Sequence, residues 1–227
     1  SPFSIPEDEL GAALFSNGDL ELVLGQAADS VAGKLNDAGN TSPVAFADLL
    51  TSVNLGQLRE AVDYLSSPFV LPTGVSAGDL ALVLNVFVGT SLLGTEIGDG
   101  TSGAVDGANT PSEVSTALTA VGKGAVSLAQ LVGAVDYLTS AFVLPTGVSA
   151  GDLALVLNLE SSVTANLTAG DIGDGTSGAV NGSNTPSEVA VALSGLSKGT
   201  VSLGQLRKAV GYLNSPFVLD VPGETDP

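Results

Sequence analysis

The chain has 227 residues, of which 44% are hydrophobic and 4% aromatic, and it contains no Cys, His, Trp or Met. Its 24 acidic and 6 basic residues give a net charge of -18, which repels the phosphates of nucleic acids and of anionic lipids. No apolar run approaches the roughly 18 residues that a membrane span needs. The composition therefore excludes nucleic acid as a partner, membrane insertion, disulfide bonds and thiol chemistry.

An internal repeat organises the chain. The segment FVLPTGVSAGDLALVLN occurs without change at 69–85 and 142–158, and a diverged version opens the chain as SPFSIP followed by SNGDLELVL. A repeat of this length predicts tandem modules. The predicted fold class is mainly α, with three tandem repeats of a small three-helix module joined by extended Pro-containing connectors. The predicted modules span 1–66, 67–139 and 140–214, and a C-terminal stub at 215–227 repeats the connector motif.

Each module begins with its connector, SPFSIP, SPFVLP or SAFVLP, in which Pro and β-type residues favour extended backbone. Whether the connectors pair as edge strands is left open. The first helix follows, and it starts with capping-box spacing, a Ser three positions before an acid. The pairs are Ser16 with Asp19, Ser76 with Asp79, and Ser149 with Asp152.

A glycine-rich loop comes next in the second and third modules, with the sequences EIGDGTSGAVDGANTP and DIGDGTSGAVNGSNTP. Its G-x-G-x-x-G pattern lies at 98–103 and 173–178, but the flanks lack the strand and helix of a dinucleotide site, so the pattern indicates turns. The loop also gathers the oxygen ligands that calcium prefers. The candidate metal ligands are Glu96, Asp99, Asp106, Asp171, Asp174 and Asn181. Solvated turn residues are the alternative, since Asp and Asn favour turns without any ligand, and no cofactor other than calcium is expected.

The second helix of each module begins at a Ser-Pro or Thr-Pro pair, and Pro suits the first helical position. Thr110 with Glu113 and Thr185 with Glu188 have capping-box spacing there, whereas the first module has Ser42-Pro43.

The third helix begins at a further cap pair and carries Leu and Val at spacings of three, four and three, which is a helical period. The cap pairs are Asn54 with Gln57, Ser127 with Gln130, and Ser202 with Gln205. The apolar faces are Leu55, Leu58, Val62 and Leu65; Leu128, Leu131, Val135 and Leu138; and Leu203, Leu206, Val210 and Leu213. All three tyrosines, Tyr64, Tyr137 and Tyr212, occupy one equivalent position. We interpret them as anchors at the edge of the core, with a ligand-stacking platform as the alternative.

Two stretches around the third helix, KGAVSLAQLVGAVDYL at 123–138 and KGTVSLGQLRKAVGYL at 198–213, resemble the second half of dockerin-type, EF-hand-like repeats. The resemblance implies a glycine, a β-branched residue and then a helix. The places of that family's acidic calcium ligands are occupied here by Thr119, Val121 and Lys123, and by Ser194, Leu196 and Lys198. The resemblance therefore implies helix geometry only, and no calcium ligands.

The inventory of side chains argues against catalysis. Without His and Cys, the chain lacks the commonest general base and the thiol nucleophile. No Lys follows a Ser by three positions, as an S-x-x-K nucleophile requires. Paired carboxylates would have to recur in three similar modules. We predict no catalytic residues and no enzyme activity.

Two functions fit these observations. The first is a non-enzymatic extracellular structural protein, the protomer of a self-assembling filament, pilus-like fibre or surface layer with head-to-tail contacts. The SPF motif recurs around Phe3 and Phe217, which makes these two residues the expected contacts with other copies of the chain. The second is a secreted or cell-surface adhesion module whose acidic glycine-rich loops bind calcium or a surface ligand.

An extracellular or cell-surface location is expected for both functions. The chain starts at Ser1 and contains no Met, which suits a processed mature product. The triplets that begin at Asn40, Asn166 and Asn181 are candidate glycan acceptors in polar surroundings. The expected partners are therefore other copies of the chain, with a glycan or surface ligand as a further option.

Overall fold

The structure is a computed structural model, and it describes residues 3–7, 13–26, 30–35, 42–50, 52–160 and 166–215. These residues form twelve helices and one isolated bridge between Glu7 and Ala13, so the prediction of a mainly α fold is confirmed. The helices are α1 (Asn17–Val23), α2 (Ser30–Leu35), α3 (Pro43–Leu49), α4 (Leu55–Ser66), α5 (Ala77–Val88), α6 (Gly94–Ile97), α7 (Pro111–Ala120), α8 (Leu128–Thr139), α9 (Ala150–Glu160), α10 (Ala169–Ile172), α11 (Pro186–Gly195) and α12 (Leu203–Asn214).

The described helices fall four, not three, to each predicted module range, so the expected helix number is wrong. In the first range the extra helix is α2. In the other two ranges the extra helices are the single turns α6 and α10, each closed by an acidic side chain. The N–H of Leu93 donates to Glu96 Oε2 (2.8 Å), and the N–H of Thr168 donates to Asp171 Oδ2 (2.8 Å). These local caps explain why the first two residues of each glycine-rich segment are helical.

The predicted capping pairs are all hydrogen-bonded. At α5, the N–H of Asp79 donates to Ser76 Oγ (3.1 Å) and the N–H of Ser76 donates back to Asp79 Oδ2 (3.2 Å). Equivalent bonds to the cap side chain open α1, α4, α8, α9, α11 and α12, and at α7 the N–H of Thr110 donates to Glu113 Oε2 (2.7 Å). Pro43, Pro111 and Pro186 begin their helices as expected. Because each cap satisfies N–H groups that a helix leaves unpaired, these short helices have defined starts.

The helices α4, α8 and α12 bury a face that differs by one residue from the predicted one. In α4 the buried residues are Leu58, Ala61 and Leu65, whereas Val62 is only half-buried. The equivalent Ala134 and Ala209 are also buried. The sequence pattern placed Val at the centre of this face, but the small Ala before it allows the neighbouring helices to approach more closely.

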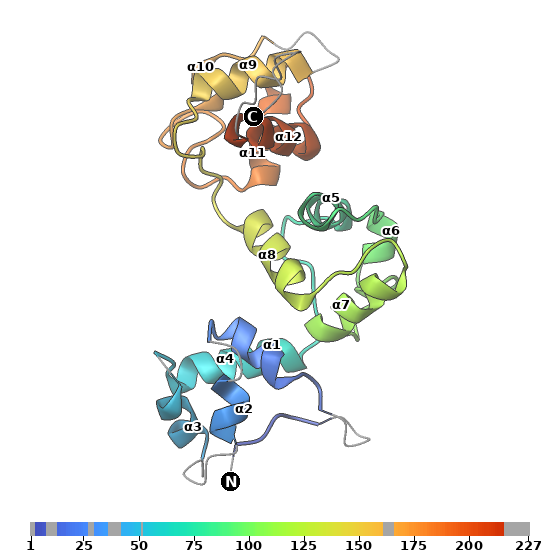
Figure 1. The fold of residues 1–227 in the computed structure, drawn as a ribbon. Coiled ribbons are helices and arrows are strands. Elements are labelled where there is room, and N and C mark those ends of the chain that lie inside the picture. The colour runs from blue at the N-terminus through green and yellow to red at the C-terminus, as the bar shows by residue number, and fades with distance from the viewer. Residues whose placement is uncertain are drawn as a thin grey trace, which may run out of the picture. The chain divides into compact units, whose positions relative to one another are not determined.

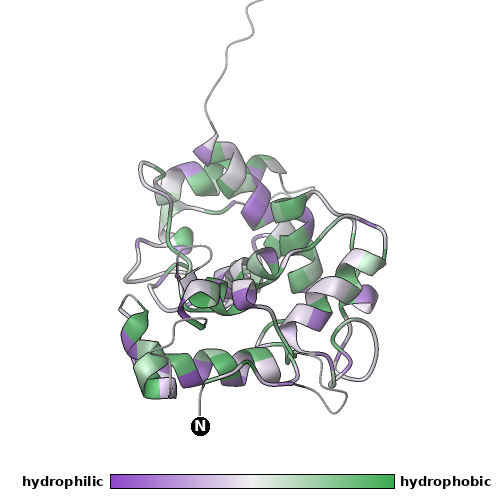
Figure 2. Ribbon diagram, turned by 60° about the horizontal axis from the view of Figure 1, so that its bottom comes forward, coloured by the Kyte–Doolittle hydropathy of each residue, from purple (hydrophilic) through white to green (hydrophobic). Residues whose placement is uncertain are grey.

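Contacts between residues divide the chain into two compact units, Ser1–Asp136 and Tyr137–Pro227. In the first unit, α1 packs against α2 and α4, α3 against α4, α5 against α6, and α4 against α7. In the second unit, α9 packs against α10 and α12, and α11 against α12; Figure 1 shows α9 to α12 as one group. Hydrophobic and hydrophilic residues share the same helices in Figure 2, as expected for amphipathic helices. No helix within the described ranges is long and apolar enough to span a membrane.

The connectors before α5 and α9 are non-helical, and among the described residues they form no strand. Phe69 and Phe142 are buried, whereas the next residues, Val70 and Val143, are 72% and 73% exposed. Such alternation is typical of extended backbone, as predicted for these segments. Among the described residues, the Phe of each connector donates one long-range backbone hydrogen bond, and no ladder of edge pairing is formed.

Candidate functional site

The glycine loops are defined here as residues 98–110 and 173–185. Each folds back onto the single-turn helix that precedes it. In the first loop, the N–H of Val105 donates to Ile97 O (2.6 Å) and the N–H of Gly100 donates to Val105 O (2.8 Å). Val180 and Gly175 repeat both bonds in the second loop, with the same lengths. Ile97 and Val105, whose carbonyl oxygens accept these bonds, are buried, as are Ile172 and Val180 in the second loop. Each loop is therefore organised around its own small apolar centre.

The glycines of the G-x-G-x-x-G pattern allow backbone to pack on backbone. Gly98 has a φ of +97°, and a Cβ built there would lie 2.7 Å from Val105 O and closer still to Ser102 O. Gly103 has a φ of +84°, and its Cβ would lie 2.6 Å from Gly98 Cα. No other residue fits such positions without moving the backbone. The interpretation of the pattern as turn-forming is thereby confirmed.

Two of the predicted calcium ligands, Asp99 and Asp174, hold the tips of the loops. Asp99 Oδ1 accepts hydrogen bonds from the N–H (3.1 Å) and the hydroxyl (2.7 Å) of Thr101. Asp174 Oδ1 accepts the same two bonds from Thr176, at 3.0 and 2.6 Å. In both cases the threonine hydroxyl first, and then the backbone N–H, lowers the pKa of the carboxyl.

Asp106 and Asn181 occupy one equivalent position and make the same bonds. Asp106 Oδ1 accepts from the N–H groups of Ala108 and Asn109, both at 2.9 Å. Asn181 Oδ1 accepts from the corresponding two N–H groups, at 3.0 and 2.9 Å. Since a neutral amide replaces the carboxylate here without loss of either bond, this position needs an oxygen acceptor and no negative charge.

The remaining two predicted ligands, Glu96 and Asp171, pair with lysines. Lys123 Nζ lies 2.7 Å from Glu96 Oε1, and Lys198 Nζ lies 2.6 Å from Asp171 Oδ2. The hydrogen bond from Lys198, followed by those from Thr168, lowers the pKa of Asp171 from 3.8 to about 2. The pKa of Glu96 is lowered in the same way, first by Lys123 and then by the N–H of Leu93.

The structure does not bring the six predicted calcium ligands together. In the part of the chain that it describes, no group of three or more acidic side chains is arranged to hold a metal ion. Each predicted ligand instead accepts hydrogen bonds from nearby backbone, hydroxyl or lysine groups. Calcium binding by these loops therefore stays a prediction.

The positions singled out by the dockerin resemblance have structural partners. Thr119 Oγ1 donates to Val126 O (3.1 Å) and accepts from Val126 N–H (2.9 Å), which ties the end of α7 to the start of α8. Ser194 and Val201 make the same pair of bonds, at 3.0 and 2.9 Å. The resemblance itself stays a prediction.

The candidate glycan and assembly residues are only partly described. Asn166 is exposed and Asn181 is half-buried, whereas Asn40 lies outside the described residues. Phe3 stacks on Phe46 with ring centroids 4.5 Å apart. Phe217, the other predicted assembly contact, and the stub beyond Ser215 lie outside the described residues.

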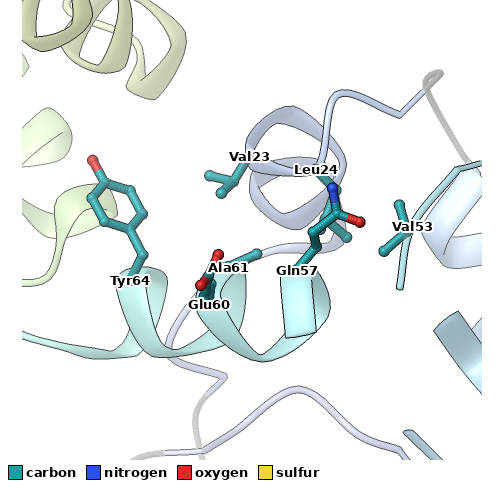
Figure 3. Close-up of a pocket in the computed structure, with 7 residues that line it drawn as sticks. All are labelled: Val23, Leu24, Val53, Gln57, Glu60, Ala61 and Tyr64. Atoms are coloured by element: carbon teal, nitrogen blue, oxygen red, sulfur yellow. The ribbon is translucent and has the colours of Figure 1, made fainter. Parts of the chain in front are cut away.

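The tyrosines gain a significance that sequence reasoning missed. Tyr64 closes one end of a cavity of about 310 Å³, together with Val23, Leu24, Val53, Gln57, Glu60 and Ala61 (Figure 3). In the second unit, the guanidinium carbon of Arg207 lies 4.6 Å from the centroid of the Tyr137 ring. No local pattern signals this pair, because Arg207 and Tyr137 are 70 positions apart in the sequence.

No protein-family model, curated protein or solved structure matches this chain.

Proposed function

We propose that this chain is a non-enzymatic structural protein, located outside the cell or at its surface, whose copies assemble head-to-tail into a filament, fibre or surface layer. In such an assembly each copy consists of three tandem helical modules, at 1–66, 67–139 and 140–214, that share one plan. Assemblies of this kind require a surface on one copy that matches a different surface on the next copy. In a chain built from repeats, each module already contacts the next one, so the last module of one copy can contact the first module of another in the same way.

The observation that carries the proposal is the recurrence of the same long-range contacts at equivalent positions. The N–H of Phe69 donates to Asn109 O, and the N–H of Phe142 donates to Asn184 O, both at 2.8 Å. Each connector thus docks on the glycine loop of the module that follows it. The lysine pairs of Glu96 and Asp171 recur in the same way. These repeated contacts favour one plan for the second and third modules.

The chemistry of the loops supports a structural role over a catalytic one. Their carboxylates accept bonds that close turns and helix ends, and the position of Asp106 is filled by an amide in the second loop. The full sequence contains no His and no Cys. The chemistry of the glycine loops therefore favours self-association over acid-base or nucleophilic catalysis.

Electron microscopy and sedimentation of the purified 227-residue chain over a wide range of concentrations test the proposal. We expect polymers with a regular repeat above a critical concentration, in near-physiological salt that screens the net charge of -18. A chain that stays monomeric at every concentration, at low and high salt and with or without calcium, contradicts it.

The alternative is an adhesion module whose glycine loops bind calcium or a surface ligand. In its favour stand the exposed carboxylates of Asp99 and Asp174 at the loop tips. Binding of calcium to the folded state must raise the melting temperature. If assembly does not involve calcium, the melting temperature does not depend on the calcium concentration.

A further inference from the structure

The three tyrosines occupy one sequence position but differ in their surroundings. Tyr64 is 37% exposed, and burial together with the charge of Asp136 raises its pKa. Tyr137 is half-buried beneath the guanidinium of Arg207. Tyr212, near the end of α12, is 68% exposed. Two tyrosines thus face a charged residue of a later helix, and the third presents its ring to solvent.

The charged residues that face Tyr64 and Tyr137 also occupy defined positions in the repeat. Asp136 lies on α8 one residue before its Tyr, and Arg207 lies on α12 five residues before its Tyr. The equivalent residues of α4 are Asp63 and Arg59, which are four positions apart and therefore lie on the same side of that helix.

The face of α4 that carries Arg59 and Asp63 is exposed. Neither side chain forms a hydrogen bond or an ion pair with any other described residue, and both are solvent-exposed. The helix α4 therefore presents the type of residue that lies over a tyrosine ring in the second unit, an arginine, together with an aspartate like the one whose charge acts on Tyr64, and no described tyrosine lies against them. The helix α12 presents Tyr212, and no such face lies against it among the described residues.

We propose that Tyr212 of one copy docks on the α4 face of a second copy, with Arg59 over the tyrosine ring and Asp63 beside it. This inference rests on the self-assembly proposed above and identifies its interface. The contact repeats between copies what Arg207 and Tyr137 form within the second unit. An arginine over an aromatic ring is attracted by the electrons of the ring face, and the attraction grows as water is excluded.

The arrangement also accounts for open-ended growth. The two surfaces lie on different helices, so a copy that uses α12 to bind one neighbour keeps its α4 face for another. Contacts of this heterologous kind build chains unless the geometry closes a ring. Pairing of Arg59 with an aromatic ring also places a cation at the interface of a protein with a net charge of -18, where contacts between acidic faces would repel.

Cross-linking in the full chain tests the contact directly, because the protein has no native Cys. A Gly211→Cys chain, which keeps Tyr212, is mixed with a Gly56→Cys chain, which keeps Arg59 and Asp63, and the mixture is treated with a short bis-maleimide reagent; both positions are exposed. We expect a covalent heterodimer from the mixture and a ladder of oligomers from the double variant. The internal pair Tyr137→Cys with Arg207→Cys serves as the positive control for reach, and Asp48→Cys, an exposed position on α3, mixed with Gly211→Cys serves as the control for position.

Assembly measurements test the energetics. Tyr212→Ala and Arg59→Glu are expected to raise the critical concentration by between about 2-fold and 30-fold, the range of an arginine–aromatic contact. Tyr212→Phe keeps the ring and is expected to assemble like the unaltered chain, as is Glu60→Gln. Because Arg59 and Tyr212 are exposed, unchanged circular dichroism and melting curves are expected for all four variants below the critical concentration, where no assembly contributes to stability.

The outcomes separate this inference from the function that it builds on. If polymers form, but Tyr212→Ala and Arg59→Glu leave the critical concentration unchanged and the mixture gives no cross-link, the interface is overturned and self-assembly is retained. A chain that is monomeric under all conditions and gives no cross-link overturns both. Equal loss of assembly in Tyr212→Phe and Tyr212→Ala also overturns the interface, since the hydroxyl and not the ring would then matter.

Discussion

The backbone N–H of Phe142 donates to the carbonyl oxygen of Asn184, 42 positions further along the chain, at 2.8 Å. Phe69 and Asn109 form the same bond at the same distance. In both cases the aromatic ring is buried, so one residue secures a connector by a polar and an apolar contact together. The connector is therefore part of the module that follows it.

Replacement of this ring tests its contribution. We expect Phe142→Ala to lower the free energy of unfolding of the second unit by about 3 to 5 kcal/mol, because it leaves a cavity where a large apolar side chain was buried. The matched control is Val143→Ala, whose side chain is exposed and whose loss is expected to matter by less than about 0.5 kcal/mol. Denaturant unfolding followed by circular dichroism measures both. Equal effects in the two variants contradict the assigned role of the ring.

Gly98 and Gly100 have nearly equal φ angles but different surroundings, so their substitution distinguishes backbone strain from steric conflict. Gly98 has a φ of +97° and Gly100 a φ of +93°, but a Cβ meets backbone atoms only at Gly98. We expect Gly100→Ala to destabilise the chain by about 1 to 2 kcal/mol through the left-handed conformation alone. Gly98→Ala adds the conflict with Val105 O and Ser102 O and is expected to cost clearly more. Thermal unfolding of both variants checks the order, and a reversed order contradicts the loop packing.

The ion pair of Asp171 and Lys198 predicts a dependence of stability on pH. The pKa of Asp171 is about 2 in the folded chain and 3.8 ordinarily, so the folded state binds the proton less readily. The pair therefore stabilises the fold above about pH 4, and this stabilisation disappears as the pH falls towards about 2.

Asp171→Asn removes the titrating group, so its unfolding free energy should change less between pH 4 and pH 2 than that of the unaltered chain. Lys198→Met should return the pKa of Asp171 towards its ordinary value. The control is Asp48→Asn, an exposed residue without a hydrogen bond or ion pair to any described residue. A pH profile of Asp171→Asn that coincides with that of the unaltered chain contradicts the prediction.

Addition of calcium is expected to leave the melting temperature unchanged. The oxygens of Asp99, Asp106 and Glu96 accept bonds from separate partners and do not converge, so the ion would have to displace those bonds. Thermal melts with calcium, with magnesium and with a chelator provide the measurement. A midpoint that rises with calcium alone, and no longer does so in Asp99→Asn with Asp174→Asn, supports the adhesion alternative instead.

The starts of the helices could be read from the sequence. Ser76 and Asp79, or Pro111 after Thr110, lie within four positions of each other, and their geometry follows from the helix itself. The mainly helical fold and the turn-forming role of Gly98 were predictable for the same reason. The extra turns α6 and α10 also depend on a local cap. Leu93 before α6 signals no helix, whereas Thr168 and Asp171 at α10 have capping-box spacing that the sequence prediction did not use.

The contacts that join distant segments depended on the tertiary structure. The helices that pack on α4 decide whether its Ala61 or its Val62 faces the protein core, since either residue fits a helical period. Likewise, nothing local distinguishes Asp171 as a partner of Lys198 from Asp171 as a cation ligand. The sequence by itself determined where nine of the twelve described helices begin, because capping and periodicity act over a few residues. Only the tertiary structure decided which face is buried, where each carboxylate is engaged and which tyrosine stays exposed, because those outcomes depend on residues many positions apart.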